Sequence, residues 1–213
     1  TGVMELQPGQ VNWGSYNPQP YPGAVRMWLW NAFAGGLDLI CSYRFRQPLY
    51  GGEQFHYGMV GTDGVTPLNG GQQYSQFMSE IRELRKQYTP NAPMPKEYAA
   101  RKTAMVYNMD NVWETTVQPQ TFQCNEREHI AKYYSAVKSL TAPVEIVSET
   151  KDLSAYPFVV VPAFQMVDKG LVEKWAQYAK NGGNLVVSVR TGLKDRNGHF
   201  PEAPWADFIT NLI

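Results

Sequence analysis

The fold is decided by residues 3–13, which read Val-Met-Glu-Leu-Gln-Pro-Gly-Gln-Val-Asn-Trp. Two apolar residues lead to Glu5, and a loop rich in glycine and proline then continues to Gly23. After that loop, apolar side chains recur at helical spacing, at Val25, Trp28, Leu29, Ala32 and Phe33. Gly35-Gly36 predicts the end of this helix, because glycine adopts the left-handed cap conformation without a steric penalty. These residues therefore predict a strand, a long loop and a helix.

The same order of elements follows once more. Residues 37–43 predict a buried strand, and residues 44–71 predict a second long loop. A helix with one apolar face comes next, formed by Tyr74, Phe77, Ile81, Leu84 and Tyr88. Long loops after strands and short turns after helices are typical of a TIM (β/α)8 barrel, whose working loops follow its strands. Two βα units cannot close a barrel by themselves. We therefore expect this part of the chain to form the last two units of a barrel whose other six units lie upstream.

Three prolines, Pro90, Pro93 and Pro95, predict a linker between two domains, residues 1–95 and residues 96–213. Beyond the linker we expect strands over residues 103–107, 144–147, 158–161 and 185–189, and helices over residues 126–140, 169–180 and 205–213. Strands that alternate with helices in this way predict an α/β domain with a doubly wound parallel sheet. The helical pattern reaches the last residue, so we expect this domain to be truncated.

Composition argues against several classes of protein. The chain has 19 Lys and Arg against 19 Asp and Glu, so no excess of positive charge is available for a phosphate backbone. No apolar run reaches the roughly 18 residues that a membrane span needs. The two cysteines, Cys41 and Cys124, form neither a disulfide framework nor a metal-ligand spacing. We therefore expect no nucleic-acid or membrane partner and no cofactor. The start lacks a signal-peptide pattern, which favours the cytoplasm but leaves the compartment open.

Candidate site residues lie at the end of the first strand and in the two long loops. Glu5 ends the first strand, where catalytic side chains of barrel enzymes lie, although it could also be a solvated glutamate near the chain start. Trp13 could stack on the apolar face of a sugar, or simply close its loop onto the barrel rim. Glu53 and His56 follow the next strand and could hydrogen-bond sugar hydroxyls on the same rim. Their ExxH spacing is flanked by glycines and lacks the HExxH helix, so we expect no metal.

Charged and nucleophilic residues elsewhere leave alternatives open. Arg44 and Arg46 could keep a carboxylate ionised, or could form structural ion pairs with Asp38 or Asp63. Cys124 has His129 five residues on, but such a pair is set by the fold rather than by the sequence. An amidotransferase-like fold would place its cysteine on a sharp turn after an apolar strand. Here that place reads Val161-Pro162-Ala163-Phe164, so we do not expect a catalytic cysteine. Asn181-Gly182-Gly183 does not fit the G-x-G-x-x-G pattern of a dinucleotide-binding loop, so we expect no dinucleotide site there.

The first 88 residues resemble the family 42 glycoside hydrolases, the β-galactosidases. The likeness rests on residues 3–13 and on several short motifs: Asn17-Pro18, Pro22-Gly23, Arg26, Trp28, Ser42-Tyr43-Arg44-Phe45-Arg46 and Glu53-Gln54-Phe55-His56. The resemblance implies that Glu5 is the nucleophile, that Trp13 lines the galactose subsite, and that Glu53 and His56 bind galactose hydroxyls. It also implies a retaining hydrolase that acts on β-galactosides.

The second half looks like the trimerisation domain of the same family, a flavodoxin-like module related to class I amidotransferases. This weaker likeness rests on residues 156–163, Gly182-Gly183 and Arg190-Thr191-Gly192, and it implies a homotrimer. The chain departs from the family at Leu6 and in its Tyr-Arg-Phe-Arg run, and no residue matches the acid/base glutamate, which lies on an earlier strand. We therefore expect the chain alone to be inactive. Two alternatives remain, a non-catalytic assembly module and a free-standing flavodoxin-like binding domain.

Overall fold

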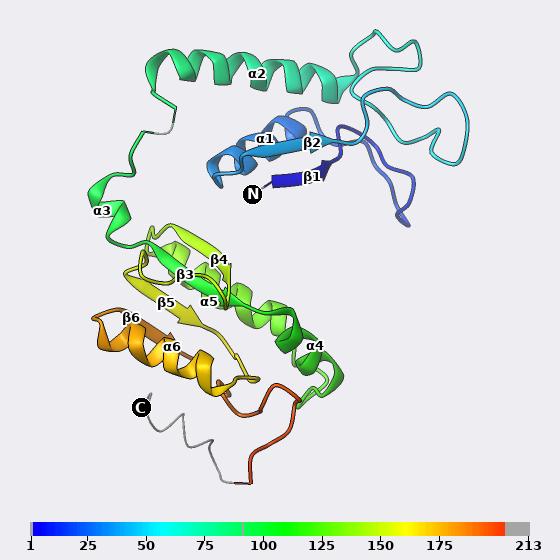
Figure 1. Cartoon of the computed structure of the whole chain (residues 1–213). Helices are drawn as coiled ribbons and strands as arrows, with labels where there is room; N and C mark the ends of the chain where they lie inside the picture. The colour runs from blue at the N-terminus through cyan, green and yellow to red at the C-terminus, as the bar shows by residue number, and fades with distance from the viewer. Residues whose placement is uncertain (1, 91, 203–213) are drawn as a thin grey trace. The chain divides into compact units, whose positions relative to one another are not determined.

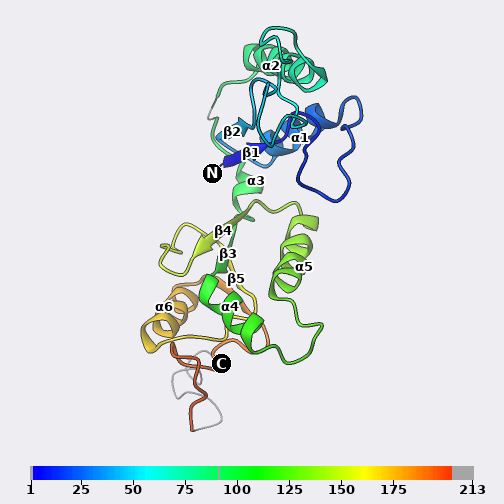
Figure 2. The same cartoon turned by 90° about the vertical axis from the view of Figure 1, so that its right-hand side faces the viewer.

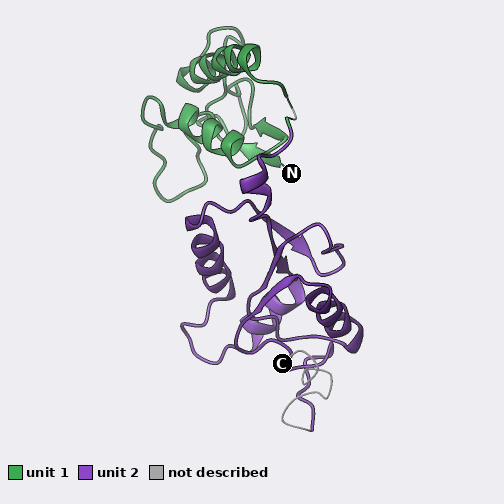
Figure 3. Cartoon of the chain, turned by 90° about the vertical axis from the view of Figure 1, so that its left-hand side faces the viewer, with its two compact units in different colours: residues 1–92 green, residues 93–213 purple. Residues whose placement is uncertain are grey.

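The computed structural model describes residues 2–90 and 92–202, and it divides into two compact units, Thr1–Ala92 and Pro93–Ile213 (Figure 3). The helix expected over residues 205–213 lies outside the described residues. Within the described part of the chain, none of the helices is long and apolar enough to cross a membrane. Both units combine helices with parallel strands, which confirms the predicted α/β class (Figure 1).

Unit 1 follows the predicted strand–helix order twice. Strand β1 (Gly2–Leu6) pairs in parallel with β2 (Leu39–Ser42), while α1 (Ala24–Ala34) and α2 (Asn69–Gln87) follow them. Strand β2 is shorter than the expected residues 37–43 and is not buried, since Leu39 is 49% exposed. The reason is that β1 is the only strand that pairs with β2 among the described residues, so the sheet buries little of either strand.

The core of unit 1 lies between its two helices. Val25 and Leu29 of α1 pack against Phe77 and Ile81 of α2. Trp30, rather than the expected Trp28 and Phe33, joins this core, and it lies edge-on to Phe77 at 5.2 Å. Trp30 packs against the core because this position gives its indole a hydrogen-bonding partner: Trp30 Nε1 donates to Glu80 Oε2 over 2.8 Å. The N–H of a Trp that packs into a core usually finds such a partner, and α2 supplies one for the half-buried Trp30.

The first turn of α2 lies directly against the two long loops of unit 1. A Cβ atom added at Gly70 would lie 1.8 Å from the carbonyl oxygen of Pro8, and one added at Gly71 would lie 2.1 Å from that of Met59. Pro8 belongs to the loop after β1, and Met59 belongs to the loop after β2. These two glycines therefore let one helix end hold both loops at close range.

Unit 2 contains a four-stranded parallel sheet with helices on both faces (Figures 1 and 2). Its elements in chain order are α3 (Lys96–Ala99), β3 (Thr103–Tyr107), α4 (Met109–Val117), α5 (Glu126–Ser139), β4 (Val144–Ser148), β5 (Phe158–Val161), α6 (Lys169–Lys180) and β6 (Asn184–Val187). The strand order is β4-β3-β5-β6. The expected strands 103–107 and 158–161 and the expected helix 169–180 match in full. Strand β6 begins one residue before the expected strand and ends two residues early, and neither α3 nor α4 was predicted.

Alternate residues of the central strands point to opposite faces of this sheet. Val159 and Val161 of β5 pack against Trp175 and other buried residues of α6, while Val160 packs with Ile130 of α5. Both faces are therefore covered by helices, as is typical of parallel sheets. Helix α4 is capped by Asn108, whose side chain accepts a hydrogen bond from the backbone N–H of Asn111.

Replacing Gly70 by alanine tests the close contact at the start of α2. Helix propensity alone favours alanine by about 1 kcal/mol at an internal helix position. We expect the opposite sign, a loss of about 1–3 kcal/mol in the free energy of unfolding, because the new methyl group overlaps the Pro8 carbonyl. Urea denaturation followed by circular dichroism measures the change.

Gly52→Ala is the matched control, since a Cβ at Gly52 meets nothing within 4 Å. We expect Gly52→Ala to change the unfolding free energy by less than about 0.5 kcal/mol. A Gly70→Ala variant as stable as the control would show that the loops do not depend on this contact.

Candidate functional site

The loops after β1 and β2 meet because parallel neighbouring strands end at the same edge of a sheet. Tyr43 and Arg44, which are joined by a cis peptide bond, follow β2 directly, and the Tyr43 N–H donates to the Leu6 carbonyl over 3.3 Å. Further along, the Tyr57 N–H donates to the Gln10 carbonyl over 2.9 Å. The pairing of β1 with β2 is irregular between Val3 and Leu6, and such irregularities re-aim side chains near functional sites.

A chain of hydrogen bonds joins Glu5 to His56. Gln7 Nε2 donates to Glu5 Oε1 over 2.6 Å, and Gln7 Oε1 lies 2.6 Å from His56 Nε2. The Glu5 side chain is exposed, whereas His56 is only 1% exposed. The His56 ring also lies edge-on to Tyr43 with 5.1 Å between centroids. Residues from both loops therefore form one connected cluster below the exposed carboxylate.

Glu53 stands beside this cluster and is held by two donors. Its Oε2 accepts from the Tyr43 hydroxyl over 2.7 Å and from Arg44 Nη1 over 3.0 Å. The pKa of Tyr43 is raised, first by its hydrogen bond to Glu53 and then by burial; the charges of Glu53 and Glu5 add to this, and Arg44 opposes it. Glu53 is thus joined to the Glu5–Gln7–His56 cluster through Tyr43, which contacts both His56 and Glu53.

The structure brings together three of the four residues singled out in the sequence. Glu5, Glu53 and His56 lie in one cluster, but Trp13 is 70% exposed and makes no hydrogen bond or ring contact with a described residue. Its neighbour Asn12 anchors the loop instead, since Asn12 Nδ2 donates to the Gly52 carbonyl over 2.5 Å. The sequence analysis missed Gln7, although its position two residues after Glu5 on an extended chain could have indicated it.

Among the described residues, neither arginine after β2 forms an ion pair with Asp38 or Asp63, which was one of the two alternatives that the sequence left open. Arg44 pairs with Glu53 at 3.0 Å, and Arg46 donates to the backbone carbonyl of Thr62. The Asp63 carboxylate is occupied by Thr66 and the backbone of Val65, and these hydrogen bonds lower its pKa to about 2. Arg44 is therefore part of the site, beside the candidate sugar-binding carboxylate. Over residues 2–90 and 92–202, no group of three or more His, Cys, Asp or Glu side chains could hold a metal ion.

Unit 2 has a cavity of about 220 Å³ next to Ala163, which follows β5. Ala163 has a left-handed backbone (φ 46°), so the predicted sharp turn is present but carries no nucleophile. Cys124 and His129 both line the cavity, and no hydrogen bond joins them among the described residues. The expectation that Cys124 is not catalytic stays a prediction.

Glu126 is the one buried carboxylate that lines this cavity, with 6% of its surface exposed. Burial raises its pKa to about 6, against the opposing effects of a hydrogen bond from Thr115 and the positive charge of Arg190. Burial, with Lys132 and Arg190, also lowers the pKa of His129.

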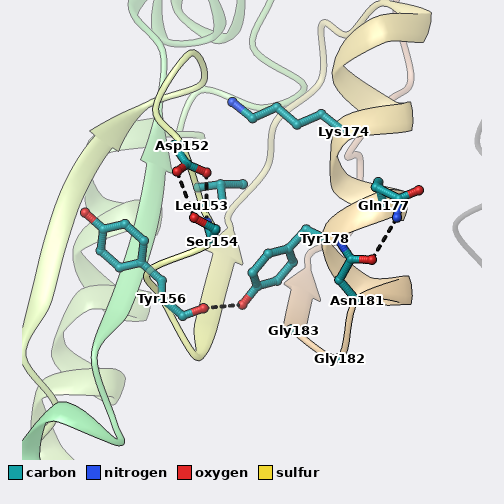
Figure 4. Close-up of a pocket in the computed structure, with 10 residues that line it drawn as sticks. All are labelled: Asp152, Leu153, Ser154, Tyr156, Lys174, Gln177, Tyr178, Asn181, Gly182 and Gly183. Atoms are coloured by element: carbon teal, nitrogen blue, oxygen red, sulfur yellow. Dashed lines mark hydrogen bonds between the residues drawn. The ribbon is translucent and has the colours of Figure 1, made fainter.

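A second, larger hollow of about 440 Å³ lies between the loop after β4 and helix α6 (Figure 4). Its polar groups already have partners within the protein. Tyr178 donates to the Tyr156 carbonyl over 2.8 Å, and Ser154 donates to Asp152 (Figure 4). Lys174 donates to two backbone carbonyls. We therefore assign no site to this hollow.

Family models match both units. One, described as the β-galactosidase trimerisation domain, matches residues 101–213, and another, described as β-galactosidase, matches residues 1–84. Similar curated proteins include the β-galactosidase Bga of Halorubrum lacusprofundi, 34% identical over 211 residues, and a β-galactosidase of Thermus thermophilus, 30% identical over 200 residues. These alignments cover 99% and 94% of this chain but only 29% of each relative.

Solved structures give the same result. The β-galactosidase of the psychrophilic Marinomonas ef1 matches 99% of this chain with a TM-score of 0.86 and 30% identity. The polyextremophilic β-galactosidase of Halorubrum lacusprofundi matches 100% of it with a TM-score of 0.85 and 31% identity. The matched parts are 32% and 30% of those two chains, so this chain spans about a third of their length.

The raised pKa of Glu126 predicts a specific pH dependence of stability. Between the ordinary value of 4.5 and about 6, the folded protein binds more protons than the unfolded chain, so stability falls as pH rises through this window. Glu126→Gln removes this pH-dependent loss of stability, because glutamine does not ionise. Relative to the unmodified protein, the variant should gain up to about 2 kcal/mol in unfolding free energy between pH 4.5 and pH 7.5.

Urea denaturation at a series of pH values measures this gain. Glu128→Gln, exposed on the same turn of α5, is the control and should leave the pH dependence almost unchanged. If the unfolding free energies of Glu126→Gln and of the unmodified protein changed with pH in the same way, the raised pKa of Glu126 would be contradicted.

Proposed function

The chain belongs to the family 42 β-galactosidases, and we propose that its first unit supplies the nucleophile and part of the sugar site of such an enzyme. The activity is that of a complete enzyme, because the chain spans only about 30% of its relatives. The observation that carries the proposal is the cluster of Glu5, Gln7 and His56. It places an exposed carboxylate at the carboxyl end of a parallel strand, joined to the next loop.

We propose that unit 1 forms the last two βα units of a (β/α)8 barrel, within a domain of residues 1–95. Its two parallel strands, each followed by a long loop and a helix, support this assignment. For residues 96–213 we propose a flavodoxin-like trimerisation domain. The order β4-β3-β5-β6 is that of the first four strands of a flavodoxin-like sheet, in which the second strand lies at the edge.

The proposed reaction is a double displacement at the anomeric carbon of a terminal β-galactoside. Glu5 attacks that carbon, the glycosidic C–O bond breaks, and a second carboxyl group protonates the departing oxygen. Water, deprotonated by the same second group, then breaks the covalent galactosyl ester and restores Glu5. Retaining enzymes hold the two carboxyl groups about 5–5.5 Å apart. The acid/base glutamate has no match in this chain, so we propose that the chain alone does not turn over substrate.

Glu53 is well arranged to bind a sugar hydroxyl. Both of its donors, Tyr43 and Arg44, bind Oε2, so Oε1 is left to accept from a hydroxyl group. Trp13 is exposed and can stack on the apolar face of a galactose ring once a sugar is bound. A direct hydrogen bond from His56 to a hydroxyl needs its buried ring to become exposed.

Azide rescue tests the role of Glu5 in the complete enzyme. Glu5→Ala should reduce turnover of 2,4-dinitrophenyl β-galactoside to background, because the attacking oxygen is gone. Azide should restore turnover by attacking the anomeric carbon from the face that Glu5 used, which releases dinitrophenolate and forms α-galactosyl azide in one inversion. Nuclear magnetic resonance of the product identifies the anomer.

Glu53→Gln is the matched control for this experiment. It should raise KM, and azide should not increase its turnover, since the nucleophile is intact. Formation of β-galactosyl azide by Glu5→Ala would instead assign Glu5 as the acid/base. Failure of azide to rescue Glu5→Ala, together with rescue of Glu53→Gln, would move the nucleophile to Glu53.

The second proposal, assembly into a homotrimer, is tested by light scattering on the purified 213-residue chain. The family model over residues 101–213 supports a trimer, so we expect three times the mass of the 24.1 kDa chain. A monomer at micromolar concentration would contradict assembly by this domain. A trimer that persists in Glu5→Gln would show that assembly does not depend on the catalytic carboxylate.

A further inference from the structure

We propose that Gln7 is a positioning residue, which fixes His56 as the Nε2–H tautomer and leaves one defined oxygen of Glu5 free to react. The second part of this proposal rests on the role proposed for Glu5 above. The first part depends only on the geometry of unit 1. Gln7 lies two residues after Glu5, and its side-chain amide spans from the loop after β1 to the loop after β2.

The direction of the amide follows from its two neighbours. An ionised carboxylate accepts hydrogen bonds only, so the NH₂ group of Gln7 must face Glu5, at 2.6 Å from Oε1. The carbonyl oxygen of Gln7 therefore faces His56 Nε2, also at 2.6 Å. A carbonyl oxygen cannot donate, so His56 Nε2 must carry the hydrogen.

The other ring nitrogen of His56 completes the assignment. His56 Nδ1 is buried and has no hydrogen-bonding partner among the described residues. A second N–H at this position would leave a buried donor unsatisfied and would also make the ring cationic, and both are costly in a buried site. The ring is therefore neutral, with its one hydrogen on Nε2.

His56 is a rigid anchor for this chain of bonds. Its ring is 1% exposed and packs edge-on against Tyr43, and its backbone N–H donates to the Glu53 carbonyl over 2.8 Å. Gln7 transmits this rigidity to Glu5, which lies at the exposed strand end. Because Gln7 holds Oε1 and no described residue donates to Oε2, the second oxygen is the one presented for attack.

Nuclear magnetic resonance on the 213-residue chain tests the tautomer. The chain has three histidines, His56, His129 and His199, so long-range ¹H–¹⁵N spectra at pH 8 resolve each ring, and His56→Gln identifies the signals of His56. We expect Nε2 of His56 to show the shift of a protonated nitrogen and Nδ1 that of an unprotonated one. In Gln7→Ala, the two shifts should move toward each other as the tautomers interconvert.

Gln10→Ala is the matched control, a glutamine in the same loop whose side chain accepts from Gln19 and does not reach His56. It should keep the pure Nε2–H pattern. An Nδ1–H ring in the unmodified chain would overturn the proposal, even if Gln7→Ala failed to fold. A folded Gln7→Ala variant with unchanged His56 shifts would overturn it as well.

Kinetics of the complete enzyme test the effect on Glu5. Gln7→Ala should lower kcat by about 10- to 100-fold through loss of orientation, while KM changes less than threefold. A rise in KM with unchanged kcat would assign Gln7 to substrate binding and overturn the positioning role. The tautomer result does not involve catalysis, so it can hold even if the azide experiment reassigns the nucleophile.

Discussion

The site depends on how closely the first turn of α2 approaches the two loops of unit 1. Gly70 and Gly71 place the backbone of this turn against the carbonyl groups of Pro8 and Met59, at distances that no side chain would allow. Glu5 at the end of β1 and Gln7 in the loop that follows it can then share a single hydrogen-bonded cluster with Glu53 and His56 of the second loop.

Much of the fold could be predicted from the sequence, because most elements have clear boundaries. Helix α6, for example, begins after Asp168 and ends before Asn181-Gly182-Gly183, and it was predicted to the residue. The predictions that were wrong concern residues whose structure is set by contacts with residues far away in the sequence. Trp30, which is half-buried, packs against the core in place of Trp28 because Glu80, fifty residues away, accepts its N–H. Helix α4 is rich in threonine and valine, which favour strands, and Asn111 ties it to the backbone of Met166 over 2.9 Å.

The candidate site could be predicted only in part. The resemblance to the family pointed to Glu5, Glu53 and His56, and the structure places the three in one cluster. It did not indicate that His56 is buried, because burial is set by Tyr43 and Gln7 from other segments. Gln7 itself went unnoticed, since an amide shows its role only once both of its neighbours are known. Trp13 lies apart from the cluster, and sequence alone gave no way to foresee that.

The two-stranded sheet of unit 1 has a consequence for how this chain behaves in solution. Among the described residues, β1 and β2 pair only with each other, so each has one edge whose backbone N–H and C=O groups lack a neighbouring strand. In the (β/α)8 barrel proposed above, these edges pair with neighbouring strands, and a closed barrel leaves no edge exposed. The 213-residue chain by itself would expose them, so growth in its particle size with concentration would report edge-to-edge pairing of strands rather than assembly into a closed ring of three copies.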